Sequence, residues 1–244
     1  MLPLLQLRPA YCRRNPSLIG IIPEKFSILH VAAQWGIPAI VEFVSRSNDQ
    51  HHMAEELIRL PDAHGATALQ CAATSGYPSV VRVLLDLGAQ VTAKVTEAAA
   101  GSSRNGKELI TILLDKRGDE ITITEEAVKA AAGNEGSGKE VMTLLLERRG
   151  GDITITDEVV KAAAGNYGNG KEVMTLLLKR RGGDITITEE VVKAAAGNED
   201  SGKKVITLLL DRRGGDITIP DEVVKAAAGN YGNAKDVMTL LLER

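Results

Sequence analysis

The chain has 244 residues, 44% of them hydrophobic but only 3% aromatic, so its core must be built from Ala, Val, Leu and Ile. Its formal net charge of −3 argues against a nucleic-acid binder that depends on neutralising phosphates. Two cysteines, Cys12 and Cys71, provide neither a disulfide framework nor a paired metal motif, and they suit a reducing compartment.

Residues 1–26 show no helical period and are interrupted by four prolines. We expect either an irregular segment that packs over the first repeat or a flexible tail. Its short apolar run precedes the basic residues, which is the reverse of a signal peptide, and no stretch of the chain approaches the length of a membrane span. We therefore expect a cytoplasmic protein, with the nucleus as the alternative.

Residues 27–90 contain two similar stretches, SILHVAAQWG from Ser27 and TALQCAATSG from Thr67, each followed by a second apolar stripe. They resemble two ankyrin repeats and meet that family's pattern at most positions, although Ala68 and Gln70 replace the usual Pro and His. The copies are 40 residues apart, against about 33 in the family. The excess falls at about 49–62, where we expect a longer finger or an extra helical turn. The resemblance implies structural hydrogen bonds for the ring of His30.

Residues 91–244 form five units with a period of 32 residues, and an Ile-Thr-Ile signature marks four of them at Ile121, Ile153, Ile185 and Ile217. A fixed period of this size indicates a stacked repeat protein. Each unit is predicted to hold two helices. In the second unit we expect Thr124 to cap the first helix, Gly133-Asn134 to end it in left-handed geometry, and residues 139–149 to form the second helix.

These units resemble divergent ankyrin repeats through their helix lengths, their Ala-Ala-Ala cluster (residues 130–132 and copies) and their Leu-Leu pair. They are similar to the near-identical arrays of fungal ankyrin proteins of the NLR or vegetative-incompatibility type. The resemblance implies an all-α, ankyrin-type α-solenoid of seven stacked helix-turn-helix repeats, continuous over residues 27–244. Proteins of that type usually also carry a nucleotide-binding module, which this sequence lacks.

Residues 133–139, GNEGSGK, have the spacing of a phosphate-binding loop, as do residues 165–171 and 197–203. That chemistry needs a Ser or Thr after the Lys to hold magnesium, and a strand before the loop. The residues that follow the Lys are instead Glu140, Glu172 and Lys204, and a helix is predicted before each segment. We interpret the segments as turns between two helices and predict no cofactor.

No catalytic or metal-binding constellation is predicted, so we expect a protein that is not an enzyme. His51 and His52 are adjacent and lack the spacing that would place two ligands on one helix face. Glu126, Lys129 and their copies are interpreted as solvated ion pairs within each helix. A small-molecule site or an enzyme in a groove near Trp35, Tyr77 and the histidines is a remote alternative.

The near-identical units differ mainly in the turn between their helices and near the end of the second helix. Turn substitutions cost little stability, so drift is one explanation and contact with a partner is the other. The residues that we nominate as partner contacts are Glu135, Tyr167, Asn169, Glu199, Asp200, Tyr231, Asn233 and Lys179.

The function we expect is a non-enzymatic protein–protein interaction module. It would serve as a scaffold or recognition array, or as the ligand-sensing part of a fungal immune or incompatibility receptor. Its binding surface is expected on the concave side, formed by first helices and the segments between repeats. The alternative is a structural protein that stacks end to end or forms a homodimer, because the chain ends on Leu240-Leu241-Leu242 without a polar capping repeat.

Overall fold

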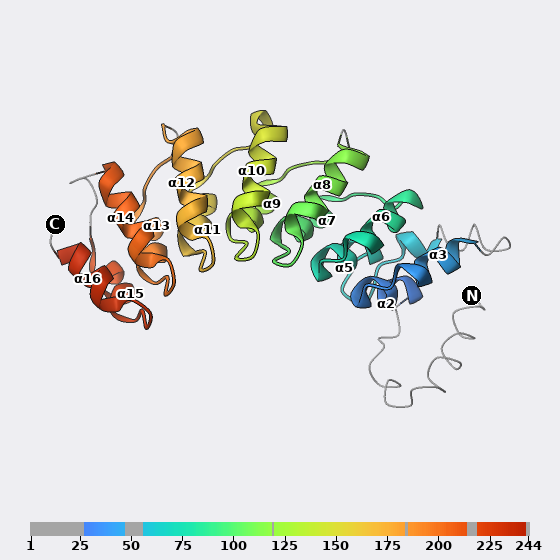
Figure 1. Ribbon diagram of the computed structural model, residues 1–244, viewed down its shortest axis with the longest axis horizontal. Coiled ribbons are helices and arrows are strands. Elements are labelled where there is room, and N and C mark those ends of the chain that lie inside the picture. The colour runs from blue at the N-terminus through green and yellow to red at the C-terminus, as the bar shows by residue number, and fades with distance from the viewer. Residues whose placement is uncertain (1–26, 47–55, 119, 184, 214–218, 243–244) are drawn as a thin grey trace, which may run out of the picture.

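The structure is a computed structural model, and it describes residues 27–46, 56–118, 120–183, 185–213 and 219–242. Over these residues the chain forms seven helix pairs that stack along one gently curved row (Figure 1). Apart from one isolated bridge between Pro61 and Thr67, these residues contain no β-structure. The expected all-α solenoid is confirmed.

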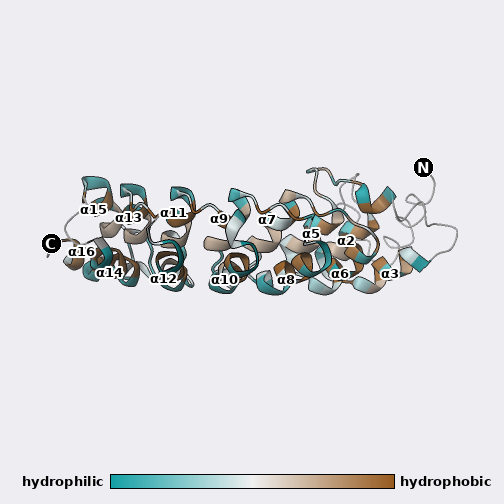
Figure 2. Ribbon diagram, turned by 90° about the horizontal axis from the view of Figure 1, so that it is seen from above, coloured by the Kyte–Doolittle hydropathy of each residue, from teal (hydrophilic) through white to brown (hydrophobic). Residues whose placement is uncertain are grey.

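The helices form two rows, which Figure 2 shows from above. The first helices of the pairs make one row: α2 (Ile28–Trp35), α5 (Ala68–Ser75), α7 (Ala93–Gly101), α9 (Glu125–Ala132), α11 (Asp157–Gly165), α13 (Glu189–Ala196) and α15 (Asp221–Ala228). The second helices make the other: α3 (Pro38–Arg46), α6 (Pro78–Asp86), α8 (Gly106–Arg117), α10 (Gly138–Arg149), α12 (Gly170–Arg181), α14 (Gly202–Arg213) and α16 (Ala234–Leu242). A 3₁₀ turn, η3 (Gly150–Asp152), follows α10.

The first helices begin where the sequence predicts. Thr124 caps α9, since its hydroxyl oxygen accepts a hydrogen bond from the Ala127 N–H at 3.3 Å. Two acidic residues in the first turn, Glu125 and Glu126, favour the positive end of the helix dipole. In the last unit Pro220 takes the N-cap position, where its missing N–H costs nothing.

The end of the first helix differs from the prediction for Gly133 and Asn134. Gly133 has φ −83° and ψ −2°, and no described residue other than glycine has a positive φ. Left-handed caps occur instead at Gly36 and Gly76, in the ankyrin-like stretch, with φ of 68° and 76°. The expected left-handed geometry was wrong for the 32-residue units. The N–H groups of Gly133 and Asn134 bond the carbonyls of Lys129 and Ala131 while Gly133 keeps right-handed geometry.

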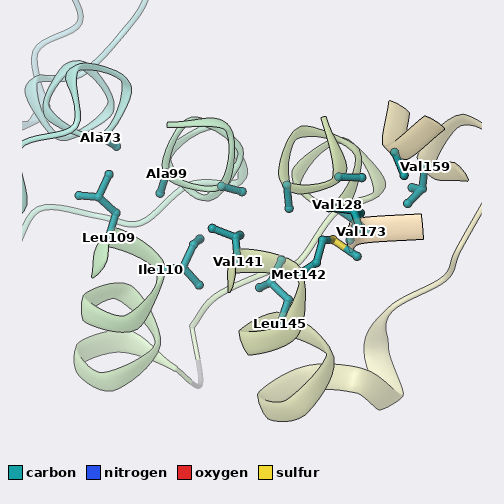
Figure 3. Packing of buried hydrophobic residues seen from close by; sticks show 14 of the residues in the cluster. Ala73, Ala99, Leu109, Ile110, Val128, Val141, Met142, Leu145, Val159 and Val173 are labelled. Atoms are coloured by element: carbon teal, nitrogen blue, oxygen red, sulfur yellow. The ribbon is translucent and has the colours of Figure 1, made fainter. Parts of the chain in front are cut away.

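The core runs without interruption along the stack. In the third unit, α11 buries Val159 and Val160 together with two alanines, and α12 buries Val173, Met174 and Leu177. Figure 3 shows the same arrangement for neighbouring units, with valines of the first helices lying over the residues of the second helices. Because each unit packs on its neighbours alone, stability is a sum of unit and interface contributions.

His30 has the structural role that the ankyrin resemblance implies. Its Nε2–H donates to the Ala66 carbonyl at 3.0 Å, which leaves Nδ1 to accept from the Ser27 hydroxyl at 2.7 Å. Burial lowers the pKa of His30, against the opposing effects of the Ala66 carbonyl and Asp62. The neutral ring therefore joins the first pair of helices to the segment before the second.

Several sequence predictions fall outside the described residues. These are the two alternatives for residues 1–26, the pair His51-His52, and the part of the expected finger at 49–55. Of the remainder of that finger, residues 56–59 are helical, and Leu57 and Ile58 are buried.

Candidate interaction surface

Four asparagines at the same place in successive units form an asparagine ladder: Asn134, Asn166, Asn198 and Asn230. Each is only 1–2% exposed. The Nδ2 group of Asn166 donates to the carbonyl of Ala132 at 2.8 Å and to that of Asn134 at 3.0 Å, both in the preceding unit. The other three members make the equivalent pair of bonds. The ladder therefore joins each of the last four units to the one before it.

The carboxamide oxygen of each ladder asparagine shapes its own turn. Oδ1 of Asn134 accepts from the N–H groups of Gly136 and Ser137 at 3.0 and 2.9 Å, and Oδ1 of Asn166 accepts from the Asn169 N–H at 3.0 Å. Each ladder asparagine thus joins the end of the first helix of the preceding unit to the turn of its own unit. Sequence reasoning missed this role, although an invariant Asn beside variable turn residues was a visible signal.

The segment that resembles a phosphate-binding loop is a turn between α9 and α10, as predicted. The start of α10 is the place where a phosphate would bind. There the Lys139 N–H donates to Oδ1 of Asn169, from the next unit, at 2.9 Å. A Cβ atom at Gly138 would lie 2.9 Å from both that oxygen and the Ala131 carbonyl. The neighbouring turn therefore fills the space beside this helix end.

Six of the eight nominated contact residues are exposed. The turns that carry most of them follow the lower edge of the array in Figure 1. Tyr231 is 95% exposed and Tyr167 43% exposed. The exposed members of the set are Glu135, Tyr167, Glu199, Asp200, Tyr231 and Lys179.

The other two nominated residues, Asn169 and Asn233, are half-buried and bonded to the preceding turn. Nδ2 of Asn169 donates to the Glu135 carbonyl at 2.7 Å, and Nδ2 of Asn233 donates to the Glu199 carbonyl at 2.6 Å. These bonds hold neighbouring turns side by side. They explain why the position carries Asn or Ser in every unit, since both types can reach the preceding unit.

The acidic and basic residues of the first helices form a charge ladder. Each lysine except Lys225 lies between the glutamate of its own helix and the glutamate of the next unit, so the pairing extends beyond the ion pairs expected within one helix. The N–O distances run from 2.7 to 4.0 Å. Its members are Glu126, Lys129, Glu158, Lys161, Glu190, Lys193, Glu222 and Lys225.

A second series of charges runs along the ends of the second helices, and Lys179 interrupts it. Arg148 pairs with Asp115 at 2.9 Å, and Arg180 pairs with Glu147 at 3.3 Å, in each case one unit back. By this register Arg212 faces Lys179 instead of a carboxylate. Neither Lys179 nor Arg212 makes an ion pair with any described residue. Two like charges at this point leave a small basic area.

An open hollow of about 450 Å³ lies on the row of first helices, at the junction of α5, α7 and α9. Gln70 of α5, Lys94 and Glu97 of α7 and Ala130 of α9 are among the residues that line it. Trp35 and Tyr77, near which the sequence suggested a groove, are not among the residues that line this hollow. The Tyr77 ring instead packs against Gly36, where a Cβ atom would come within 2.5 Å of it.

The described residues contain no group of three or more His, Cys, Asp or Glu side chains placed to hold a metal ion. Burial raises the pKa of the Cys71 thiol to about 11. At neutral pH this thiol is therefore protonated and a poor nucleophile. None of the helices in the described part of the chain is long and apolar enough to cross a membrane.

The 32-residue units match a family model described as a domain of unknown function, DUF7104. Five successive matches, at residues 84–109, 112–142, 144–174, 176–205 and 208–238, together cover more than half of the chain. The chain belongs to the DUF7104 family. All five DUF7104 matches begin within one second helix and end within the next, so the family frame is displaced by about half a unit from the helix pairs.

The N-terminal part matches a model described as ankyrin repeats (3 copies), over residues 11–95. The crystal structure of the human ASB11 ankyrin repeat domain superposes with a TM-score of 0.61 at 19% identity, covering 90% of this chain and 98% of that one. The ankyrin repeat domain of Bcl-3 superposes with a TM-score of 0.55 at 21% identity, covering 89% and 98%. The DUF7104 units therefore continue an ankyrin fold. No curated protein matches the sequence.

Proposed function

We propose that this DUF7104 protein is a non-enzymatic recognition array that binds a partner protein in the cytoplasm. The ankyrin fold is typical of protein–protein interaction modules. The observation that carries the proposal is the row of exposed, variable turn residues on an otherwise repeated scaffold. Buried positions repeat because each must fit the same neighbours, whereas exposed turn positions are free to follow a ligand.

The binding surface in this proposal combines the turns with the adjacent face of the first helices. Tyr167 and Tyr231 are its expected anchors, since tyrosine supplies a large contact area with few rotatable bonds. The basic area at Lys179 and Arg212 would complement an acidic group of the same partner or of a second one. The ligand-sensing part of a fungal immune or incompatibility receptor is the finer form of this proposal.

Replacing both tyrosines by alanine should abolish partner binding without unfolding the array. Affinity capture from an extract of the source organism, followed by quantitative mass spectrometry, should recover a protein with the wild-type chain. The Tyr167→Ala/Tyr231→Ala variant should recover at least about tenfold less of it.

The matched control is Glu172→Ala/Lys204→Ala, which removes two exposed side chains from the second helices. It should capture the same protein as the wild-type chain. Failure of every form to enrich a protein over an unrelated ankyrin array would refute the proposal. Equal capture by both variants would show that the partner binds elsewhere than at the two tyrosines.

A second candidate function is self-association through the last pair of helices. Ala228 is exposed, whereas its counterparts Ala132, Ala164 and Ala196 are fully buried by the next unit. Leu242 is 74% exposed. A homodimer that covers this face should appear in light scattering as a mass that increases with concentration, and Ala228→Glu should abolish the increase. A strict monomer at high concentration would rule it out.

A further inference from the structure

The first DUF7104 unit departs from the later ones on the face of its first helix. Position 94 holds Lys where later units hold Glu, and position 97 holds Glu where later units hold Lys. The charge ladder therefore stops at α9. Neither Lys94 nor Glu97 makes an ion pair or side-chain hydrogen bond with any described residue. Every lysine of the later first helices, by contrast, has a carboxylate partner.

The reversal places two acidic side chains in neighbouring positions. In the later units each lysine reaches the glutamate of the next unit, as Lys129 reaches Glu158 at 3.7 Å. By the same register, Glu97 stands beside Glu126. The ammonium group of Lys129 lies 3.9 Å from the Glu126 carboxylate, but it also pairs with Glu158. Like charges in these positions repel one another unless a cation lies between them.

A second departure occurs in the same unit, at Ser102. This residue occupies the position of the asparagine ladder, but its side chain is shorter than that of asparagine. Ser102 is 5% exposed and lines the hollow, and its hydroxyl makes no hydrogen bond within the described part of the chain. The described residues contain no buried side-chain polar atom that lacks a hydrogen-bond partner, so this hydroxyl is open to the hollow. A ligand group in the hollow can therefore bond it.

Both departures line the open hollow described above. The hollow is lined by small residues, Ala98, Gly101 and Ala130, and by polar ones, among them Gln70, Lys94 and Glu97. The side-chain amide of Gln70 also has no hydrogen-bond partner among the described residues. The lining thus combines small residues with unpaired side chains of positive, negative and neutral polar type. Such a surface suits an extended peptide, which can offer main-chain polar groups and side chains of different polarity to it.

We propose that this hollow binds an extended segment of the partner protein and that an arginine or lysine of that segment lies between Glu97 and Glu126. Lys94 is about 4.5 Å further along the axis of α7 and donates to a carbonyl or carboxylate of the same segment. Small side chains of the segment cover Ala98, Gly101 and Ala130. This inference rests on the proposed function and names the chemistry that one part of its surface recognises.

A library of random 12-residue peptides displayed on phage is the probe. Selection on the intact chain should enrich peptides that share a basic residue at one aligned position. Synthetic copies are then titrated by fluorescence anisotropy. Glu97→Lys, which restores the charge of the later units, should weaken binding by at least about tenfold. Changing the shared basic residue of the peptide to Glu should restore binding to Glu97→Lys.

The matched control is Glu190→Lys, which makes the same change of net charge within the intact charge ladder and should leave peptide affinity within about twofold of the wild type. Glu97→Lys should not lower the thermal midpoint, because the introduced lysine gains Glu126 of the next unit as a carboxylate partner, in the register of Lys129 and Glu158. Lost binding then cannot reflect unfolding. Equal weakening by both variants, enriched peptides without a shared basic residue, or no enrichment would each overturn the inference. The capture experiment with the tyrosine variant tests the proposed function independently.

Discussion

Asn166→Ala should lower the free energy of unfolding by about 3–5 kcal/mol, a large effect for one polar side chain. The substitution removes the two bonds to Ala132 and Asn134 and the bond to the Asn169 N–H. It leaves the two carbonyls in residues that are almost fully buried, where water cannot readily replace the side chain. Urea denaturation followed by circular dichroism measures the change.

The position of Asn166 also predicts how the array will unfold. Because the ladder joins each unit to the one before it, its interruption weakens an interface between units in the middle of the stack. Unfolding should then separate into two transitions, whereas the wild-type chain should show one. Asn169→Ser is the control, since two other units carry Ser at this position, and it should cost less than about 1 kcal/mol. A cost for Asn166→Ala as small as that of the control would contradict the role of the ladder.

The architecture was predictable from the sequence because the residues that determine each helix pair lie within one 32-residue unit. The 32-residue period, the acidic residues after Thr124 and the alternation of apolar with polar residues all lie within one unit. Both helices of the unit follow from them, with ends within a residue or two of those observed. The ankyrin resemblance of residues 27–90 located the remaining pairs.

What connects one unit to the next was not predictable in the same way. The partners of Asn166 are main-chain carbonyls 32 and 34 residues earlier, and the identity of a residue says nothing about where its carbonyl points. The left-handed cap expected at Gly133 was wrong for a related reason, since the last carbonyl of α9, that of Ala132, accepts its hydrogen bond from Asn166 of the next unit. The inter-unit pairing of Lys129 with Glu158 also depends on the stacking distance.

The structure separates the nominated contact residues into those that bond the scaffold and those that do not. Asn169 and Asn233 are held in bonds between turns, so their type is restricted by the scaffold. Tyr167 and Tyr231 occupy a place where the alternate units carry glutamate, and no bond of the scaffold demands an aromatic ring there. The informative departures from the repeat are therefore those that leave a group unpaired, as at Lys94, Glu97 and Lys179.

The helix assignment of the array predicts a second large effect, from Leu177→Ala. Leu177 is fully buried in α12, and removing its side chain beyond Cβ should cost about 2–5 kcal/mol. The adjacent Leu176→Ala is the matched control, because it deletes the same atoms from the same helix at a half-buried position. It should cost less than about 2 kcal/mol. Differential scanning calorimetry should show a marked fall in the midpoint for Leu177→Ala, and equal midpoints for the two variants would show that α12 does not present Leu177 to the core.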